Sequence, residues 1–298
     1  MIYNYSDIKD RLNLDLSFNQ IMKNNTKANV LLVVPARLNS SRLPNKVLAD
    51  IGGKPMLQRV LEQCKKAIDR SKIVLCTDSE KLSLLAKNLN IKFLLTSESC
   101  NSGTDRIASV IDTLIEISSN NFNNVSFENV EDIIKNTLII NVQGDQPYLE
   151  PKVIKKMISF FYSHSKLPSI VTPIYKLQKE NIHNPSVVKV LINKNCEAVY
   201  FSRSALPHIR DKKRDEWHLY YDYWGHVGIY GFRADILSAW STLSQSDLEK
   251  NEKLEQLRFI DSGIKISTFK VEGDFLSIDT SEQLEEVRKN LNANNLKF

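Results

Sequence analysis

The 298-residue chain lacks the sequence features that mark several large classes of protein. It has no run of 18 apolar residues that could cross a membrane, and its beginning has no apolar signal-peptide core. Its 40 lysines and arginines are spread along the chain and stand against 35 acidic residues, a net charge of +5 without a basic block. We therefore expect no membrane association, no nucleic-acid partner and a cytoplasmic location.

Cysteine motifs and glycine-rich phosphate motifs are also missing. The four cysteines are Cys64, Cys76, Cys100 and Cys196, and they form neither a CxxC pair nor a spacing typical of zinc sites. Reduced thiols in a cytosolic protein are the simplest interpretation. The chain has neither a Walker A loop nor a G-x-G-x-x-G turn. A nucleotide site, if present, must be of another kind.

Apolar residues make up 42% of the chain, which is enough for one large α/β domain or two small ones. Apolar strand patterns at 30–34, 73–75 and 91–95 alternate with helix patterns at 55–69 and 80–89. This β-α-β-α-β order with short connections predicts a doubly wound, parallel sheet.

The first strand runs into a polar, cationic stretch. Arg37, Arg42 and Lys46 fall within ten residues, and Pro44 argues against one continuous helix carrying them. We expect a loop at the carboxyl end of a strand, where open α/β sheets bind ligands. Two guanidiniums and an ammonium on such a loop suit a polyphosphate, although a solvated basic loop remains the alternative.

An acidic residue follows another apolar strand, at 137–142. Asp145 comes directly after this strand, so it should lie at the same edge of the sheet as the cationic loop. Because magnesium prefers carboxylate and phosphate oxygens, Asp145 is the first candidate metal ligand. An aspartate in a turn before Pro147 is the structural alternative.

The second half of the chain changes in character. Residues 187–191 and 198–201 predict a hairpin, 226–232 a strand and 252–260 a helix. The stretch 208–224 mixes cations with aromatic residues, and we interpret it as a variable loop over the substrate pocket, or as a dimer contact, rather than as a nucleic-acid surface.

Motifs in order over residues 30–292 resemble those of the sugar-acid cytidylyltransferases. They are PARLNSSRLPNKVLADIGGKPM, SGTDR, QGDQP, NPSVVKV with SRSALP, HVGIYGF, LEQLR and IDTSEQL. The resemblance implies a Rossmann-like doubly wound sheet of the nucleotide-diphospho-sugar transferase type, with a smaller subdomain for sugar binding and homodimerisation. Residues 1–28 form an extension outside the match. Residues 29–298 then form one domain, with a nucleotide part at about 29–150, a sugar part at about 170–262 and a C-terminal metal-binding part at about 263–298.

The resemblance also implies roles for particular residues. The nucleotide would be bound by Pro35, Ala36, Arg37, Arg42, Lys46, Ser102, Gly103, Arg106 and Gln143, with Arg37, Arg42, Lys46 and Asp145 as the catalytic groups. The sugar acid would be bound by Gln143, Arg203, His226, Tyr230, Glu255 and Gln256, and Mg²⁺ by Asp145 and Asp279. Two positions depart from the family pattern: Gln146 stands where glutamate is common, and Gly225 where a basic residue is common. Ala205, within the SRSALP motif, is also changed, and these changes keep a modified sugar open as the substrate.

The implied reaction is transfer of CMP from CTP to the anomeric hydroxyl of 3-deoxy-manno-octulosonate (Kdo), an eight-carbon sugar acid of lipopolysaccharide, with loss of pyrophosphate. An amino-modified Kdo or a sialic acid is an alternative substrate. A CTP-binding regulator without catalysis is an alternative from another class. A sugar-1-phosphate nucleotidyltransferase is disfavoured, because its glycine-rich opening run is missing.

Overall fold

The computed structural model describes residues 29–40, 43–120, 130–273, 275, 278 and 280–292. Several predictions lie outside these residues. They concern the extension 1–28, the side chains of Arg42 and Asp279, and residues 121–129 of the asparagine-rich stretch.

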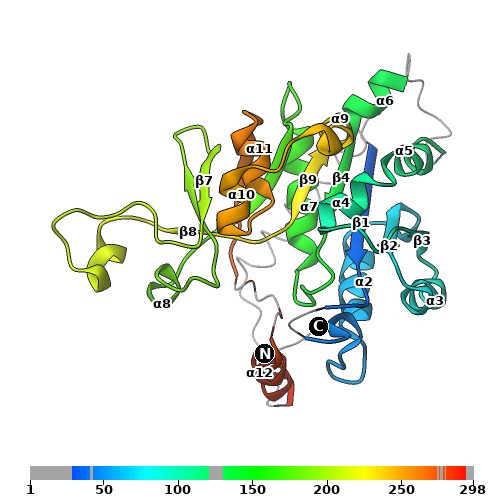
Figure 1. The fold of residues 1–298 in the computed structure, drawn as a ribbon, viewed down its shortest axis with the longest axis horizontal. Coiled ribbons are helices and arrows are strands. Elements are labelled where there is room, and N and C mark those ends of the chain that lie inside the picture. Colours follow the sequence, from blue (N-terminus) through cyan, green and yellow to red (C-terminus); the bar gives the residue numbers. More distant parts are fainter. Residues whose placement is uncertain are drawn as a thin grey trace, which may run out of the picture.

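In the part of the chain that the structure describes, ten strands form one mixed sheet (Figure 1). The strands are β1 (Asn29–Ala36), β2 (Ile73–Thr77), β3 (Lys92–Leu95), β4 (Thr137–Asn141), β5 (Ile170–Lys176), β6 (Lys189–Ile192), β7 (Ala198–Ser202), β8 (Trp224–His226), β9 (Tyr230–Arg233) and β10 (Ile266–Lys270). Their order is β3-β2-β1-β4-β9-β5-β8-β6-β7, and β10 pairs with β5. The β3-β2-β1-β4 part is parallel, whereas β9 runs antiparallel to both β4 and β5.

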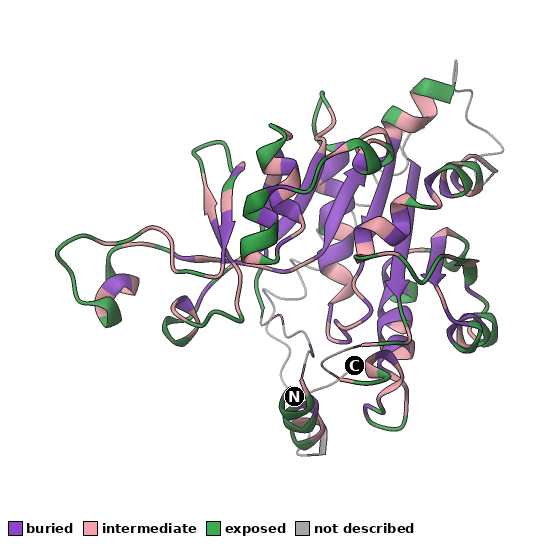
Figure 2. Ribbon diagram, viewed as in Figure 1, coloured by how far each residue is buried: buried purple, intermediate pink, exposed green. Residues whose placement is uncertain are grey.

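Helices cover both faces of the sheet, as the doubly wound prediction requires. They are α2 (Met56–Ala67), α3 (Glu80–Asn88), α4 (Gly103–Ala108), α5 (Ile111–Asn120), α6 (Val130–Asn136), α7 (Pro151–Tyr162), α8 (Lys179–Ile182), α9 (Ala234–Ser238), α10 (Asp247–Glu252), α11 (Gln256–Asp261) and α12 (Ser281–Asn292). On β1, Leu32 and Val34 pack with α2, α3 and α7, while Leu31 and Val33 pack with α4, α5, α9 and α11. Both faces of β1 are therefore buried, which explains its continuous apolar sequence (Figure 2).

Three elements are shorter than the apolar patterns predict. The apolar residues Ile107, Ile111 and Leu114 have the spacing of one continuous helix, but α4 ends at Ala108 and α5 begins at Ile111. Ser109 Oγ donates to the Arg106 carbonyl at this break. The strand predicted at 226–232 divides into β8 and β9 around Gly228, whose φ is +83°. The helix predicted at 252–260 divides at Lys253, where a left-handed residue ends α10.

The chain reverses its direction of winding beside β1. From β1 it proceeds outward to β2 and β3, then returns to β4 on the other side of β1. Ligands of open α/β sheets bind at such a switch point, outside the carboxyl ends of the strands. The segments that follow β1 and β4 are the cationic loop and the QGDQP turn, so the topology brings the two predicted motifs to one crevice.

The remaining segments close the two ends of the molecule. Helix α12 returns to the first loop, where Leu284 and Val287 pack with Ile51 and Met56. Strands β6 and β7 form a hairpin at one end of the sheet, and the segment after β7 extends away from it (Figure 1). That segment folds around the buried Trp217, so the stretch predicted as a variable loop has a small apolar cluster of its own. Over the described residues, no helix has the length and apolarity needed to cross a bilayer.

Candidate functional site

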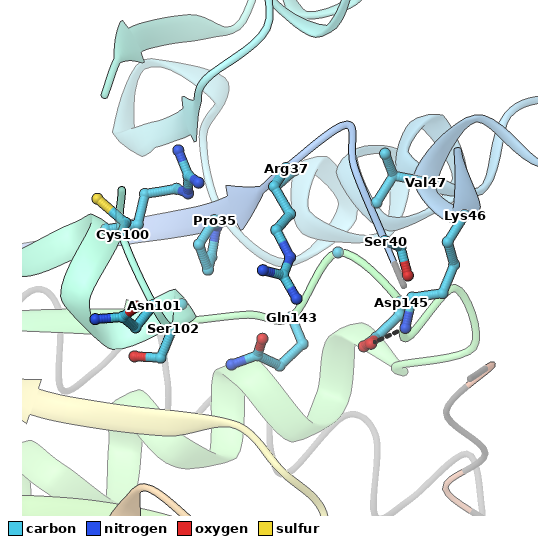
Figure 3. Close-up of a pocket in the computed structure, with 14 residues that line it drawn as sticks. Pro35, Arg37, Ser40, Lys46, Val47, Cys100, Asn101, Ser102, Gln143 and Asp145 are labelled. Atoms are coloured by element: carbon cyan, nitrogen blue, oxygen red, sulfur yellow. Dashed lines mark hydrogen bonds and ion pairs between the residues drawn. The ribbon is translucent and has the colours of Figure 1, made fainter. Parts of the chain in front are cut away.

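A cavity of about 250 Å³ lies at the switch point of the sheet (Figure 3). Its lining residues come from the loop after β1, the start of α4 and the turn after β4: Pro35, Ala36, Arg37, Ser40, Lys46, Val47, Cys100, Asn101, Ser102, Gly103, Arg106, Gln143, Gly144 and Asp145. The three predicted nucleotide motifs thus meet around one space, although they are separated by up to a hundred residues in sequence.

An ion pair spans one side of this cavity. The Lys46 Nζ atom lies 2.6 Å from Asp145 Oδ2, and both side chains are largely but not fully buried. Lys46 begins a 3-10 turn that Val47 anchors in the core, and Asp145 sits in a turn closed by the Gln146 N–H and the Gln143 carbonyl. The exposed Arg37 side chain points toward Gln143 (Figure 3). The cavity therefore combines cations, a carboxylate and an amide.

The start of α4 forms the opposite wall. Ser102 caps the helix by accepting a hydrogen bond of 3.1 Å from the Asp105 N–H. A Cβ atom on Gly103 would lie 3.1 Å from the Pro35 ring and 3.3 Å from Gln143 Oε1. Only glycine allows these three segments to approach so closely.

Arg106 lines the cavity, but its guanidinium is already bound within the protein. The side chain is buried, and Nη2 lies 2.8 Å from Asp78 Oδ2 while Nη1 contacts Thr96 Oγ1. Asp78 Oδ1 also accepts the Leu38 N–H at 3.2 Å. The geometry therefore gives Arg106 and Asp78 a role in holding the loop after β1. The nucleotide contact expected for Arg106 stays a prediction.

Five of the six predicted sugar-binding residues lie outside the lining of this cavity, and only Gln143 belongs to it. His226 ends β8 and Tyr230 begins β9, and their rings pack with centroids 5.1 Å apart. Thr172 Oγ1 donates to the Ile229 carbonyl, so His226 Nε2, 2.9 Å away, must be the donor to Thr172. Burial lowers the pKa of His226 to about 3, so its imidazole is neutral near pH 7.

Glu255 and Gln256 stand at the beginning of α11. Glu255 Oε1 accepts a hydrogen bond of 2.7 Å from Thr104 Oγ1, and burial raises the pKa of Glu255. Its other oxygen, Oε2, is buried without a hydrogen-bond partner, and the same holds for Gln256 Nε2. An acceptor and a donor left unpaired side by side in the interior indicate a place for polar ligand groups.

Arg203 has a different environment from the one its motif predicts. Its Nε atom donates to the Glu252 carbonyl at 2.9 Å and Nη1 to the Pro185 carbonyl at 3.1 Å. The guanidinium thus ties the end of β7 to α10 and to the loop before β6, and it does not line the cavity. Binding of a sugar carboxylate by Arg203 remains a prediction.

The two departures from the family pattern have local structural reasons. Gln146 Nε2 donates to the Val227 carbonyl at 2.6 Å, a bond that an ionised glutamate could not make. A Cβ atom at Gly225 would lie 2.5 Å from Leu177 and 2.7 Å from the ring of Tyr175. A basic side chain therefore has no room there, and Gly225 acts through packing rather than through pocket polarity.

Sequence reasoning missed five of the residues that line the cavity: Ser40, Val47, Cys100, Asn101 and Gly144. Four of them lie inside or directly beside the recognised motifs, so extending each motif to its neighbours would have found them. Cys100 carried no signal. From the sequence, Cys100 is interpreted only as a reduced thiol.

The donor set at Asp145 fits a magnesium ion bound together with phosphate. One cavity carboxylate with ligand oxygens and water is the environment that Mg²⁺ favours. The Ile278 N–H donates to the Asp145 carbonyl at 3.1 Å, so the chain preceding position 279 runs beside the QGDQP turn. Among the residues that the structure describes, no group of three metal-ligating side chains is found. A protein-only metal cage is therefore not part of the described site.

The sheet is doubly wound, and the cavity at its switch point combines cations, an amide and a carboxylate. Together these features define a nucleotide-binding protein of the nucleotidyltransferase class. The family model described as "Cytidylyltransferase" matches residues 31–266. The chain therefore belongs to the cytidylyltransferase family.

Individual relatives show which members of the cytidylyltransferase family this chain is similar to. The chain is 38% identical over 262 residues to the 3-deoxy-manno-octulosonate cytidylyltransferase of Polynucleobacter necessarius, covering 87% of this chain and 94% of the relative. It is 37% identical over 269 residues to the enzyme of that name from Francisella tularensis, covering 89% and 100%. The solved structure of CMP:2-keto-3-deoxy-manno-octonic acid synthetase complexed with CTP matches with a TM-score of 0.75 and 33% identity, covering 90% and 100%.

Proposed function

We propose that this protein transfers CMP from CTP to the anomeric hydroxyl of Kdo and releases pyrophosphate. The observation that carries the proposal is the cavity in which Arg37, Lys46, Asp145 and Gln143 meet. The chain that forms it is similar over nearly its whole described length to Kdo cytidylyltransferases, and the solved relative binds CTP.

The nucleotide side works by positioning and charge neutralisation. Arg37 and Lys46, with Arg42 from the same loop, bind the triphosphate and stabilise the charge that grows on the leaving pyrophosphate. Gly103 lies close against Pro35, and the lack of a side chain there would let main chain approach the nucleotide. The sugar hydroxyl attacks the α-phosphorus directly, so no covalent intermediate with the protein is required.

We propose Mg²⁺ as the cofactor, held by Asp145 and Asp279. When bound, the ion would supply neutralisation of phosphate charge. The Lys46 Nζ atom, 2.6 Å from Asp145 Oδ2, keeps this carboxylate at the cavity wall.

The sugar acid is proposed to bind next to the nucleotide, at the α11 side. Glu255 and Gln256 offer an unpaired acceptor and an unpaired donor to its hydroxyls. His226 is neutral and Tyr230 is buried, so both act as hydrogen-bonding groups rather than as charges. The carboxylate of the sugar is assigned to Arg203, which requires the guanidinium to exchange a backbone carbonyl for the ligand.

A homodimer and a cytoplasmic location complete the proposal. Strand β7 lies at the end of the sheet order, and Val199 on it is 48% exposed. Leu219 and Tyr220, on the segment that extends beyond it, are 67% and 52% exposed. Exposed large apolar side chains on an end strand and on a projecting segment support a protein–protein contact there. The four cysteines are free, which is typical of proteins of the reducing cytoplasm and supports that location.

The test is pyrophosphate release from CTP and Mg²⁺ with a panel of acceptors. The panel contains Kdo, an amino-modified Kdo, a sialic acid and a sugar 1-phosphate. We expect release with Kdo and little with the others. Release only with the amino sugar would keep the chemistry and change the substrate. No release with any acceptor, in protein that binds CTP, would contradict the proposed function and favour a regulator.

A further inference from the structure

A chain of hydrogen bonds runs through the protein interior from the cavity to Glu255. Gln143, which lines the cavity, donates from Nε2 to Asn141 Oδ1 at 3.2 Å. Asn141 Nδ2 donates to Thr104 Oγ1 at 3.4 Å. Thr104 Oγ1 donates in turn to Glu255 Oε1 at 2.7 Å. The four side chains come from β4, the turn after it, α4 and the residue before α11.

The series of hydrogen bonds has one direction, from donor to acceptor. Each donor faces the acceptor of the next residue, so the series starts at an amide in the cavity and ends on a carboxylate. Hydrogen bonds arranged in this way polarise one another, and a change at one end alters the strength of the others. Thr104 and Asn141 are completely buried, so water does not compete with these bonds.

Thr104 is the residue that joins the two sides. Its neighbour Gly103 lines the cavity and lies against Gln143, as the Cβ distance of 3.3 Å shows. Its hydroxyl occupies one oxygen of Glu255 and leaves the other, Oε2, without a partner. A carboxylate fixed by one oxygen can present the second in a defined direction.

We propose that Thr104 is a positioning residue that couples the nucleotide cavity to the sugar-acid site through Glu255. The inference rests on the proposed function, because it needs the sugar acid to contact Glu255 Oε2. Occupation of the cavity orders Gln143, the hydrogen-bond chain strengthens, and Glu255 is held in the orientation that accepts a sugar hydroxyl. The two substrates therefore bind more tightly together than either does alone.

The first experiment compares Thr104→Val with Thr104→Ser by steady-state kinetics. Valine keeps the volume and removes the hydroxyl, whereas serine keeps the hydroxyl and serves as the matched control. We expect T104V to raise the KM for Kdo about ten- to a hundredfold, the loss typical of a hydrogen bond to a charged group. The KM for CTP should change less than about twofold, because no direct nucleotide contact is removed. T104S should stay near wild type.

A merely structural role of Thr104 would give a different pattern. General loosening of the core would raise both KM values and would be the same in a Glu255→Gln background. Coupling through Glu255 predicts instead that T104V adds little once Glu255 has been changed. An unchanged KM for Kdo in folded T104V, or full additivity with E255Q, would overturn the proposal.

A second measurement needs only the wild-type protein. The affinity for CTP is measured by calorimetry in the presence of a chelator, with and without saturating Kdo. We expect Kdo to tighten CTP binding at least about fivefold, and T104V to bring this ratio close to one. A ratio of one in wild type would overturn the coupling even if T104V fails to fold. Failure of the proposed function is distinguishable, since the wild type would then release no pyrophosphate with any sugar acid.

Discussion

The two halves of the candidate site hold their polar groups in opposite ways. On the nucleotide side, Arg37 is exposed and the Lys46–Asp145 pair retains side-chain exposures of 12% and 24%. On the sugar side, Tyr230 and Gln256 are 4% and 3% exposed. The first half offers charges at an open edge, whereas the second, apart from Arg203 and Glu255, offers neutral donors and acceptors in the interior.

This difference matches what each half would have to recognise. A triphosphate carries several charges, and partly solvated cations can bind it without a large desolvation cost. A sugar acid is distinguished by its hydroxyls, and buried groups left without a partner discriminate strongly between ligands that do and do not satisfy them. The following predictions test whether the contrast between open charges and buried neutral groups is real.

The largest effect is expected at Arg106, because its charge is buried although it lies on the nucleotide side, where the other charges are open. Arg106→Met would leave Asp78 buried without its partner, since the Arg106 side chain is 3% and the Asp78 side chain 10% exposed. Removing one member of such a pair costs about 3–5 kcal/mol. We expect the free energy of unfolding, measured in urea, to fall by that amount.

The exposed pair of Lys176 and Asp222 supplies the matched control. Its side chains are 64% and 57% exposed, so Lys176→Met should cost less than about 1 kcal/mol. CTP affinity should also fall in R106M, because Asp78 holds the Leu38 N–H and with it the loop after β1. Equal losses of stability in R106M and K176M would refute the structural role assigned to Arg106.

The next effect concerns catalysis on the open side. Asp145→Asn removes the carboxylate that pairs with Lys46 and is proposed to bind the metal. We expect the rate of pyrophosphate release to fall at least about a hundredfold, the scale of losing one electrostatic partner of the transition state. Thermal unfolding should show that the variant still folds.

Asp222→Asn is the control for Asp145→Asn, since it removes an exposed carboxylate far along the chain from the cavity motifs. It should leave the rate unchanged. A folded D145N enzyme that works at nearly the wild-type rate would contradict the role of Asp145 as a catalytic group and metal ligand.

The elements that the sequence predicted well are those with strong periodicity and clear ends. The helices predicted at 55–69 and 80–89 are found as α2 (Met56–Ala67) and α3 (Glu80–Asn88), since each has an apolar stripe. The breaks at Ser109, Gly228 and Lys253 were missed. They depend on one side-chain hydrogen bond or on one left-handed residue, which periodicity does not report.

The residues of the candidate site also divide into those that the sequence predicts and those that it misses. The cavity residues were predictable because the motifs follow strands whose carboxyl ends share one edge. The hydrogen-bond and ion-pair partners of the buried residues were not predictable from the sequence. Asp78 meets Arg106 across 28 positions and Thr104 meets Glu255 across 151, and no local pattern encodes such contacts. Only the path of the chain through the sheet brings these side chains together.

The smallest effect tests the neutral character of the buried side through pH. Burial lowers the pKa of His226 from 6.5 to about 3, so between these values the unfolded chain binds a proton that the folded protein does not. The free energy of unfolding should therefore rise with pH between about 3 and 6.5, and His226 should contribute at most about 1.4 kcal/mol per pH unit. Below about 3 and above 6.5 this contribution to the slope disappears.

His226→Gln isolates this contribution from that of the carboxylates, which titrate in the same range. We expect urea unfolding from pH 4 to pH 7 to show a shallower slope for H226Q than for wild type. His164→Gln, at an exposed histidine, is the control and should keep the wild-type slope. If H226Q and wild type lose stability in parallel on acidification, His226 is not held neutral by burial. The sugar side would then carry a titrating charge near neutral pH, and the contrast between the two halves of the site would fail at this residue.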